Sequence, residues 1–270
     1  MRLAISSDPR APTSAFTIRR RVVDLTDVFC AREAEGCVLE YGVLVAPERR
    51  DRRLGLPGAE NYPRYCALTR VRAGAERRKQ CCVWREISGS RRWGSAVVTR
   101  GLRLAEVHLK KNYYPGALTV GEVTLPDQST LIAISLYGQL EDTYSITGLH
   151  RMLSDLTPLL HGKLHKGRAP KVILGGDLNA SRQMDAKQGD NSHHIFFQRL
   201  EDFGLVDCQG AFGDGRPRTL RHRSSDFPWI NDYIFASEEL AEHVIASEVI
   251  ENPELLSLSD HNPVTVVFGL

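Results

Sequence analysis

The stretch Val172-Ile-Leu-Gly-Gly-Asp-Leu-Asn-Ala180 joins an apolar run to polar residues and decides much of the fold. The uninterrupted apolar run predicts a buried strand that ends in two glycines. Asp177 and Asn179 are two positions apart, so on an extended backbone their side chains project to the same side. We interpret Gly175 and Gly176 as room for a bulky ligand to approach these side chains. The alternative interpretation is an Asx turn that only ends the strand.

Two further segments place polar residues at the start of an apolar strand. Ser259-Asp-His-Asn-Pro263 precedes one such strand, and its Asp260 and His261 offer a hard oxygen ligand and an imidazole donor. In Asn231-Asp-Tyr-Ile-Phe235, Asp232 can accept a hydrogen bond from an imidazole N–H and fix its tautomer. Taken singly, the first segment is equally well a polar loop, and the second an ordinary strand start.

Short β-like runs surround these segments. Runs rich in Val, Ile, Leu and Thr predict buried strands over residues 38–45, 65–71, 94–99, 102–109, 117–125, 130–137, 171–174, 233–235 and 264–268. Many strands and few helices favour two sheets packed face to face with helices outside. No compositional boundary divides the chain, so we expect one α/β domain over residues 1–270.

Three helices are predicted between the strands. The first is indicated by apolar residues three or four positions apart, which line one helical face: Ile146, Leu149, Leu153, Leu156 and Leu160. Asp142 and Thr143 offer N-cap oxygens for it. A second helix over residues 193–203 stops at Gly204, and a third, short helix follows Ser237.

The composition predicts a globular protein inside the cell. Hydrophobic residues make up 42% of the 270, which is enough for a core and excludes a disordered chain. The net charge of +2 hides a basic excess before residue 101 and an acidic excess after it, which suits either a solvated surface or a polyanion bound beside a cation. No apolar run predicts a membrane span, and the first residues do not resemble a secretory signal. The six cysteines lack a C-x-x-C pair, so we expect reduced thiols and a cytoplasmic location.

Taken together and in this order, the three polar segments resemble the endonuclease/exonuclease/phosphatase superfamily, whose members include deoxyribonuclease I, exonuclease III and the apurinic-site endonucleases. The matching segments are GGDLNA (175–180), NDYIFAS (231–237) and SDHNPV (259–264), with softer matches in RWGSAVVTR (92–100) and SLYG (135–138). The resemblance covers roughly residues 92–268. It implies a four-layer α/β sandwich, with two mostly antiparallel sheets face to face and helices outside, and divalent-metal-dependent hydrolysis of a phosphate ester.

The resemblance also implies a role for each matching residue. Asp177 would activate or align the attacking water, and Asn179 would orient this water or the phosphate. His261 would hydrogen-bond a non-bridging oxygen as the pentacovalent centre forms, while Asp232 holds its ring. Tyr137 would lie beside the phosphate.

The metal site is the part that the sequence specifies least. The resemblance implies that Asp260 helps to bind Mg²⁺ or Mn²⁺, of which Mg²⁺ prefers carboxylate and water oxygens. Residues 1–90 depart from the family's pattern, and Ser7 stands where the first strand of the family normally ends in Asn. Glu40 and Glu48 compete for the place of the family's metal-binding Glu, and neither segment matches it well.

Basic residues in the loop just before NDYIFAS (231–237) favour a polyanionic substrate. The loop over residues 216–223 contains Arg221 and Arg223, which we expect to contact phosphate. The prediction is a metal-dependent phosphoesterase, in first place a nuclease with DNA or RNA as its partner. Two alternatives remain open: a phosphatase or phosphodiesterase acting on a small or lipid phosphate, and a binding-only relative without the metal. His193 and His194 lack the Cys or His spacing of a zinc site.

Overall fold

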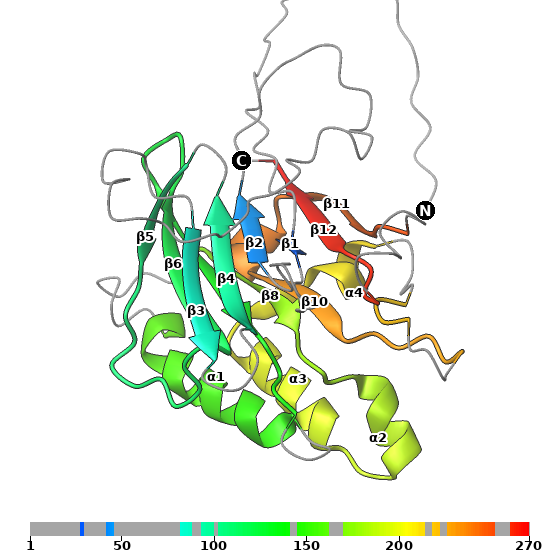
Figure 1. The fold of residues 1–270 in the computed structure, drawn as a ribbon. Coiled ribbons are helices and arrows are strands. Elements are labelled where there is room, and N and C mark those ends of the chain that lie inside the picture. The colour runs from blue at the N-terminus through cyan, green and yellow to red at the C-terminus, as the bar shows by residue number, and fades with distance from the viewer. Residues whose placement is uncertain are drawn as a thin grey trace, which may run out of the picture.

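The computed structural model describes residues 28–29, 42–45, 82–87, 93–99, 102–140, 145–161, 170–213, 218–221, 226–251 and 260–269 (Figure 1). The predicted strand over residues 65–71 lies outside them. Within the described ranges, no helix has the length and apolar character needed to cross a membrane.

A six-stranded sheet forms the centre of the molecule. Its strands are β5 (Arg103–Glu106), β6 (Leu118–Thr124), β7 (Thr130–Leu136), β8 (Val172–Asp177), β9 (Leu205–Asp207) and β10 (Asp232–Ser237), in the order β5-β6-β7-β8-β10-β9. All neighbours are antiparallel except β7 and β8, which are parallel. Parallel neighbours need a crossover connection, and helix α1 (Ile146–Leu160) lies on it.

Both faces of this sheet are buried, and alternate residues of each strand serve alternate faces. On β7, Ile132 and Ile134 belong to the core cluster that contains the apolar side of α1. Leu131 and Ala133 belong to a second cluster, which also contains the apolar residues of β12. The buried runs of the sequence are therefore continuous rather than alternating, because neither face meets water.

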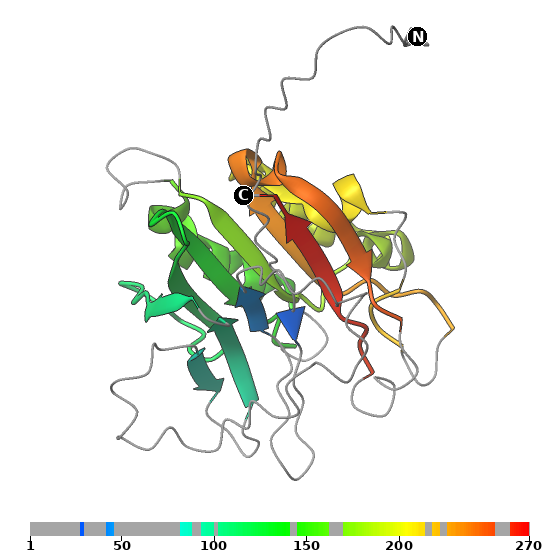
Figure 2. The same ribbon diagram turned by 90° about the horizontal axis from the view of Figure 1, so that it is seen from above.

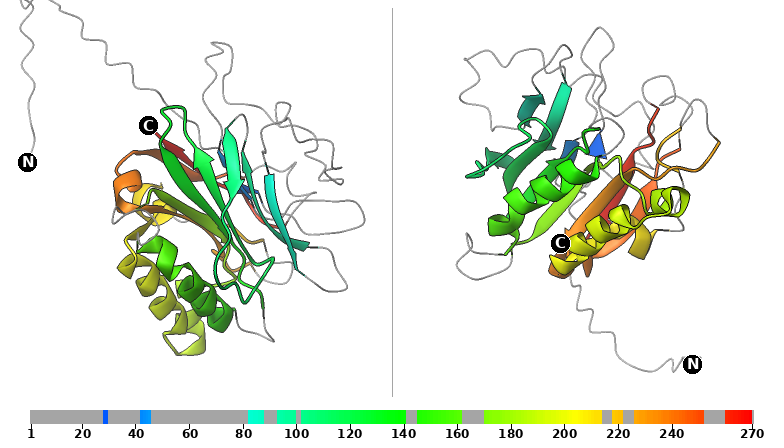
Figure 3. Two further views of the ribbon diagram at one scale, coloured as in Figure 1. Left: turned by 90° about the vertical axis from the view of Figure 1, so that its left-hand side faces the viewer. Right: turned by 90° about the horizontal axis from the view of Figure 1, so that it is seen from below.

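The helices cover one face of the central sheet. Figure 3 shows α1, α2 (Arg182–Gln188) and α3 (Ser192–Asp202) on one side of it. Two short helices, α4 (Cys208–Phe212) and α5 (Glu238–Ala241), flank β10 in sequence and contact it. The predicted helices are confirmed, including the stop of α3 at Gly204, whose φ of 71° is left-handed.

The predicted N-cap of α1 is wrong. The N-cap residue is Ser145 rather than Asp142 or Thr143, and its side chain makes no capping bond. The Ser145 hydroxyl instead donates to the carbonyl oxygen of Asn179 at 2.8 Å. The start of α1 is thus set by a tertiary contact that the local sequence does not contain.

Two smaller sheets cover the other face. One has the order β1 (Val28–Phe29), β2 (Gly42–Val45), β4 (Trp93–Thr99), β3 (Cys82–Ile87), and the other pairs β11 (Val244–Val249) with β12 (Val264–Phe268). Figure 2 shows β1 and β2 between β4 and β12, so the two small sheets lie side by side. The described residues thus form an α/β structure of helices, central sheet and small sheets, and the fourth layer of the sandwich stays a prediction.

Candidate functional site

Two carboxylates meet where β8 and β10 pair. Asp177 is the last residue of β8 and Asp232 the first of β10, and the two are direct partners in the antiparallel register. Directly opposite residues point to the same face with their Cβ atoms about 5 Å apart. Here that face is the one that β12 covers, because Ile173 and Ile234 of the same strands belong to the β12 cluster. The two residues are only 4% and 5% exposed.

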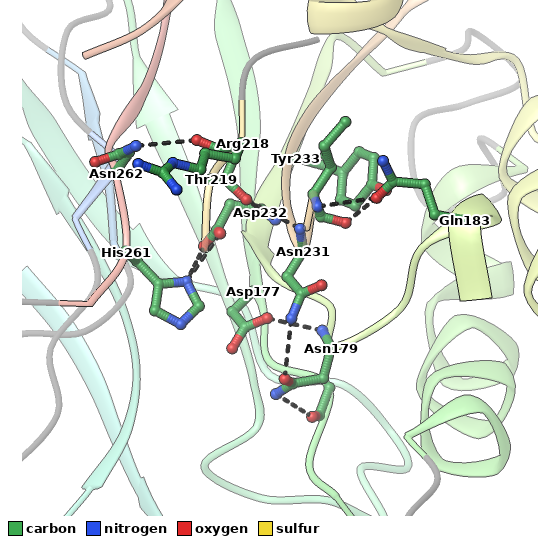
Figure 4. Close-up of polar contacts among 12 residues, drawn as sticks. Asp177, Asn179, Gln183, Arg218, Thr219, Asn231, Asp232, Tyr233, His261 and Asn262 are labelled. Atoms are coloured by element: carbon green, nitrogen blue, oxygen red, sulfur yellow. Dashed lines mark hydrogen bonds and ion pairs between the residues drawn. The ribbon is translucent and has the colours of Figure 1, made fainter. Parts of the chain in front are cut away.

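An imidazole completes the group from a third segment. His261 lies three residues before β12, and its Nδ1 is 2.9 Å from Oδ2 and 3.1 Å from Oδ1 of Asp232. A carboxylate accepts hydrogen bonds, so the Nδ1–H of the ring donates. Figure 4 shows Asp177, Asp232 and His261 gathered from three separate segments. Each offers a ligand atom within 4.8 Å of the other two, so the group can hold a metal ion.

Burial and mutual charge shift the titration of this group. Burial raises the pKa of Asp177 to about 7; the charges of Asp232 and Asp260 add to the rise, while His261 and the Asn179 N–H oppose it. For His261 burial favours the neutral ring, but Asp232, Asp177 and Asp260 together outweigh it and raise the pKa to about 10. Near neutral pH the site therefore contains a fixed cationic donor beside a carboxyl group that takes up and releases a proton.

Asn179 lies next to Asp177 in a strained conformation. Its φ of 44° is left-handed, and its backbone N–H donates to Asp177 Oδ1 at 2.8 Å. The Asx turn that the sequence offered as an alternative therefore exists together with the polar cluster. The Asn179 side chain donates from Nδ2 to the Gly138 carbonyl at 3.0 Å, and its Oδ1 faces Asn231 Nδ2 at 3.4 Å (Figure 4). The amide is thus held at both ends.

The interpretation of the glycines as room for a ligand is wrong for Gly176. Its φ is +146°, and a Cβ there would lie 2.1 Å from the Leu136 carbonyl oxygen. The glycine is needed because the ends of β7 and β8 approach closely, and the Gly138 N–H donates to the Asp177 carbonyl at 2.7 Å. The preceding residue, half-buried Tyr137, packs against the helix-side core cluster, and whether it lies beside a phosphate stays a prediction.

Thr219 is a residue at the candidate site that sequence reasoning missed. This fully buried side chain accepts hydrogen bonds at Oγ1 from the backbone N–H groups of Asn231 and Asp232, at 2.9 and 3.1 Å. Its carbonyl accepts from the Asn262 N–H at 2.6 Å, and its N–H donates to the Trp229 carbonyl at 2.9 Å. Thr219 therefore joins the start of β10 to the segment that contains His261. Nothing in its local sequence, a Thr among arginines, marks this role.

The other predicted residues are placed less directly. Asp260 is half-buried, its carbonyl accepts from the Arg221 N–H at 2.8 Å, and it is not among the three residues that can share a metal ion. Burial lowers the pKa of Arg221, as does Arg218, although Asp260 and Glu251 oppose this. The predicted ligands Glu40 and Glu48, the predicted phosphate contact Arg223, and Ser7 lie outside the described residues.

No protein-family model matches the sequence, and no curated protein matches it. Several solved structures do. The AP endonuclease of Leishmania major is 14% identical, with a TM-score of 0.48 over 64% of this chain and 72% of its own. The 3′-5′ exonuclease of Neisseria meningitidis is 20% identical, with a TM-score of 0.48 over 70% and 79%.

A further match carries the superfamily's own name. It is an endonuclease/exonuclease/phosphatase from Beutenbergia cavernae, 19% identical, with a TM-score of 0.44 over 63% of this chain and 45% of that one.

Proposed function

We propose that this chain is a divalent-metal-dependent phosphoric ester hydrolase of the endonuclease/exonuclease/phosphatase superfamily, and a nuclease that cleaves phosphodiester bonds of DNA or RNA. The observation that carries the proposal is the buried group in which Asp232 holds a cationic His261 opposite Asp177. Hydrolysis of a phosphodiester needs a base for water and a donor for the charge that develops on phosphorus oxygens, and this group supplies both.

His261 is suited to stabilise the transition state. With a pKa of about 10 the ring carries its proton throughout the neutral range. Asp232 accepts the Nδ1–H, and the Nε2–H would donate to a non-bridging oxygen of the substrate. Because the ring is held before the substrate arrives, no reorganisation is required when charge develops on that oxygen.

Asp177 is suited to act as the base. A pKa of about 7 lets the carboxylate exist near neutral pH and still accept a proton from water. The water oxygen forms the new bond to phosphorus, its proton passes to Asp177, and the bond to the leaving alcohol breaks, with that oxygen taking a proton from solvent. The Asn179 amide has one N–H beyond the bond to Gly138, and this N–H can orient the water or the phosphate.

The donors of the site fit a divalent cation. Asp177 and Asp232 present two buried carboxylates on one face. Burial is the main cause of the raised pKa of Asp177, the charges of Asp232 and Asp260 add to it, and a bound cation would oppose the rise. Asp260 would help to hold Mg²⁺ or Mn²⁺ beside this group, since Asp232 is engaged with His261 and Asp177 is the proposed base; Glu40 and Glu48 remain candidate ligands. When bound, the ion would polarise the phosphoryl group and neutralise developing charge.

Residues beside the site favour a polynucleotide over a small phosphate. Arg221 follows Leu220, which pairs with His261 in an isolated β-bridge, so Arg221 lies close to His261 along the backbone. Phe227 and Trp229 have ring centroids 4.3 Å apart, and Phe227 is 43% exposed. Trp229 is buried, so the exposed ring of Phe227 is the surface on which a nucleobase can stack. We propose Arg221, together with Arg223, as the phosphate contacts.

The test is hydrolysis of labelled single- and double-stranded DNA and RNA by the purified chain with Mg²⁺ or Mn²⁺. We expect cleavage by the wild type and a loss of about 10²-fold or more in Asp177→Asn and His261→Ala. Asp202→Asn and His243→Ala, which make comparable changes at exposed positions, should cleave like the wild type.

Three results would contradict the proposal. Equal cleavage by wild type and Asp177→Asn would place the activity elsewhere or in a contaminant. Hydrolysis of small or lipid phosphates without cleavage of nucleic acid would favour the phosphatase alternative. Salt-sensitive binding of nucleic acid without any hydrolysis, and without a rise in melting temperature on adding Mn²⁺, would favour a binding-only relative.

A further inference from the structure

A buried histidine outside the catalytic group contacts the loop that follows Asp177. His193 is only 3% exposed, although it lies in the first turn of α3. Its Nδ1 accepts a hydrogen bond from the backbone N–H of Ser181 at 3.3 Å. Its Nε2 is buried and has no hydrogen-bond partner. A neutral histidine that accepts at Nδ1 carries its proton on Nε2. The His193 Nε2–H therefore has no acceptor, while Nδ1 accepts the Ser181 N–H.

The ring is neutral in this environment. Burial lowers the pKa of His193, and the charges of Asp185 and Asp190 only partly oppose this. Asp185 in α2 also accepts the backbone N–H groups of His193 and His194, at 3.0 and 2.6 Å. The start of α3 is therefore bonded to α2 through Asp185 and to the residue before α2 through the His193 ring.

Ser181 is two residues after Asn179 and is the last residue of the loop that begins at Asp177. It is the N-cap of α2, with its side chain accepting from the Gln183 N–H. On its upstream side the loop is held by the bonds of Asn179 to Asp177 and Gly138. The left-handed φ of Asn179 costs free energy unless the surrounding structure holds it. The bond from the Ser181 N–H to His193 holds the loop on its downstream side.

The helix that carries His193 is firmly anchored. Phe196, Phe197 and Leu200 of α3 are fully buried in the helix-side core. The Phe197 ring lies 4.9 Å from that of Tyr233, the residue after Asp232. His193 therefore connects the loop of Asn179 to a helix that packs on the strand of Asp232.

We propose that His193 is a positioning residue: by accepting the Ser181 N–H, it keeps the loop from Asp177 to Ser181 in the conformation that places Asn179 in the site. Its effect on catalysis rests on the proposed function, whereas its effect on the loop does not. His193 touches neither substrate nor metal ion in this proposal and acts through the backbone alone.

Two variants separate the hydrogen bond from packing. His193→Asn is smaller than His but keeps an acceptor close to the position of Nδ1, and His193→Leu has about the volume of His without an acceptor. We expect kcat to fall about 10- to 100-fold in His193→Leu with KM within about twofold, since a small displacement of a catalytic group has that effect. His193→Asn should recover most of the loss. Equal losses in both variants would overturn the proposal, because packing alone would then explain them.

The loop itself provides a measurement that needs no activity. The Ser181 amide, followed by NMR hydrogen exchange, should exchange roughly fivefold faster in His193→Leu than in the wild type and His193→Asn, as the loss of one hydrogen bond predicts. Equal exchange in all three proteins would overturn the proposal. If the protein hydrolyses no substrate but the Ser181 amide still exchanges fastest in His193→Leu, the proposed function is refuted. The positioning role of His193 would then be retained.

A measurement on the unmodified protein covers the case in which His193→Leu does not fold. The ¹⁵N shifts of His193 report which ring nitrogen carries the proton. A protonated Nε2 with a bare, hydrogen-bonded Nδ1 is expected. A proton on Nδ1 would exclude the Ser181 contact and with it the proposal.

Discussion

Replacing Asp177 with Asn should make the protein more stable while abolishing hydrolysis. The pKa of Asp177 rises from 3.8 to about 7 because the carboxyl is buried and faces Asp232 and Asp260. One pKa unit corresponds to about 1.4 kcal/mol, so the charged form lowers the free energy of unfolding at pH 8 by roughly 4 kcal/mol. Asn is neutral, has nearly the same shape and keeps an oxygen for the Asn179 N–H. We expect Asp177→Asn to recover up to about 4 kcal/mol of stability at pH 8.

The dependence on pH distinguishes this effect from a general change in packing. A raised pKa means that the folded state binds the proton more tightly than the unfolded chain. The penalty is therefore absent below the unfolded pKa of 3.8, grows as pH rises and is complete above about 7. The stability gap between variant and wild type should thus be wider at pH 8 than at pH 5 by roughly 2 to 3 kcal/mol.

Urea unfolding in the presence of a chelator, followed by tryptophan fluorescence, measures this gap. Asp202→Asn, at the exposed end of α3, is the matched control and should change stability little at either pH. An Asp177→Asn protein that is no more stable than the wild type at pH 8 would refute the reasoning. So would a gap of the same size at both pH values.

Three further predictions follow from contacts in the site. Asp232→Asn should lower the pKa of His261 from about 10 by more than about one unit in an NMR titration, because the carboxylate bonded to the ring is lost; an unchanged pKa would contradict this. Thr219→Val leaves two buried N–H groups without an acceptor and should lower the free energy of unfolding by about 1–3 kcal/mol or more, with reduced kcat, whereas Thr219→Ser should retain both; similar losses in the two would argue against the hydroxyl. Gly176→Ala should cost more than about 3 kcal/mol in urea unfolding because its Cβ meets the Leu136 carbonyl, and near-normal stability would disprove that close approach.

The apolar patterns predicted most strands of the central sheet and its largest helix. The runs over residues 117–125, 130–137 and 264–268 match β6, β7 and β12 to within a few residues. Strands that lack such a run were missed: β11 buries only Ser247 among its six side chains, and β3 contains adjacent Arg and Glu. Helix α2 buries no residue at all, so no apolar period marks it.

Which residues lie together in the candidate site was partly predictable from the sequence, but their geometry was not. Asp232 and His261 are hydrogen-bonded, as their predicted roles require. Asp232 pairs with Asp177 because β10 lies next to β8 in the sheet. The apolar pattern of each strand does not predict this strand order. Thr219 and His193 act through backbone groups of other segments, and a sequence pattern contains no trace of such contacts.

The alternation of faces along β10 has a consequence for how this chain can change in evolution. Asp232 points to the β12 side of the sheet, and Tyr233 packs with the rings of α3 on the other. Inserting or deleting one residue just before or within the strand would exchange the faces of Asp232 and Tyr233. The carboxylate would then lie in the aromatic core, and the phenol would point toward His261. Substitutions on this strand can be absorbed one at a time, but changes in its length cannot. We therefore expect related chains to differ in length only in the connecting loops, with a constant number of residues from Asp232 to the end of β10.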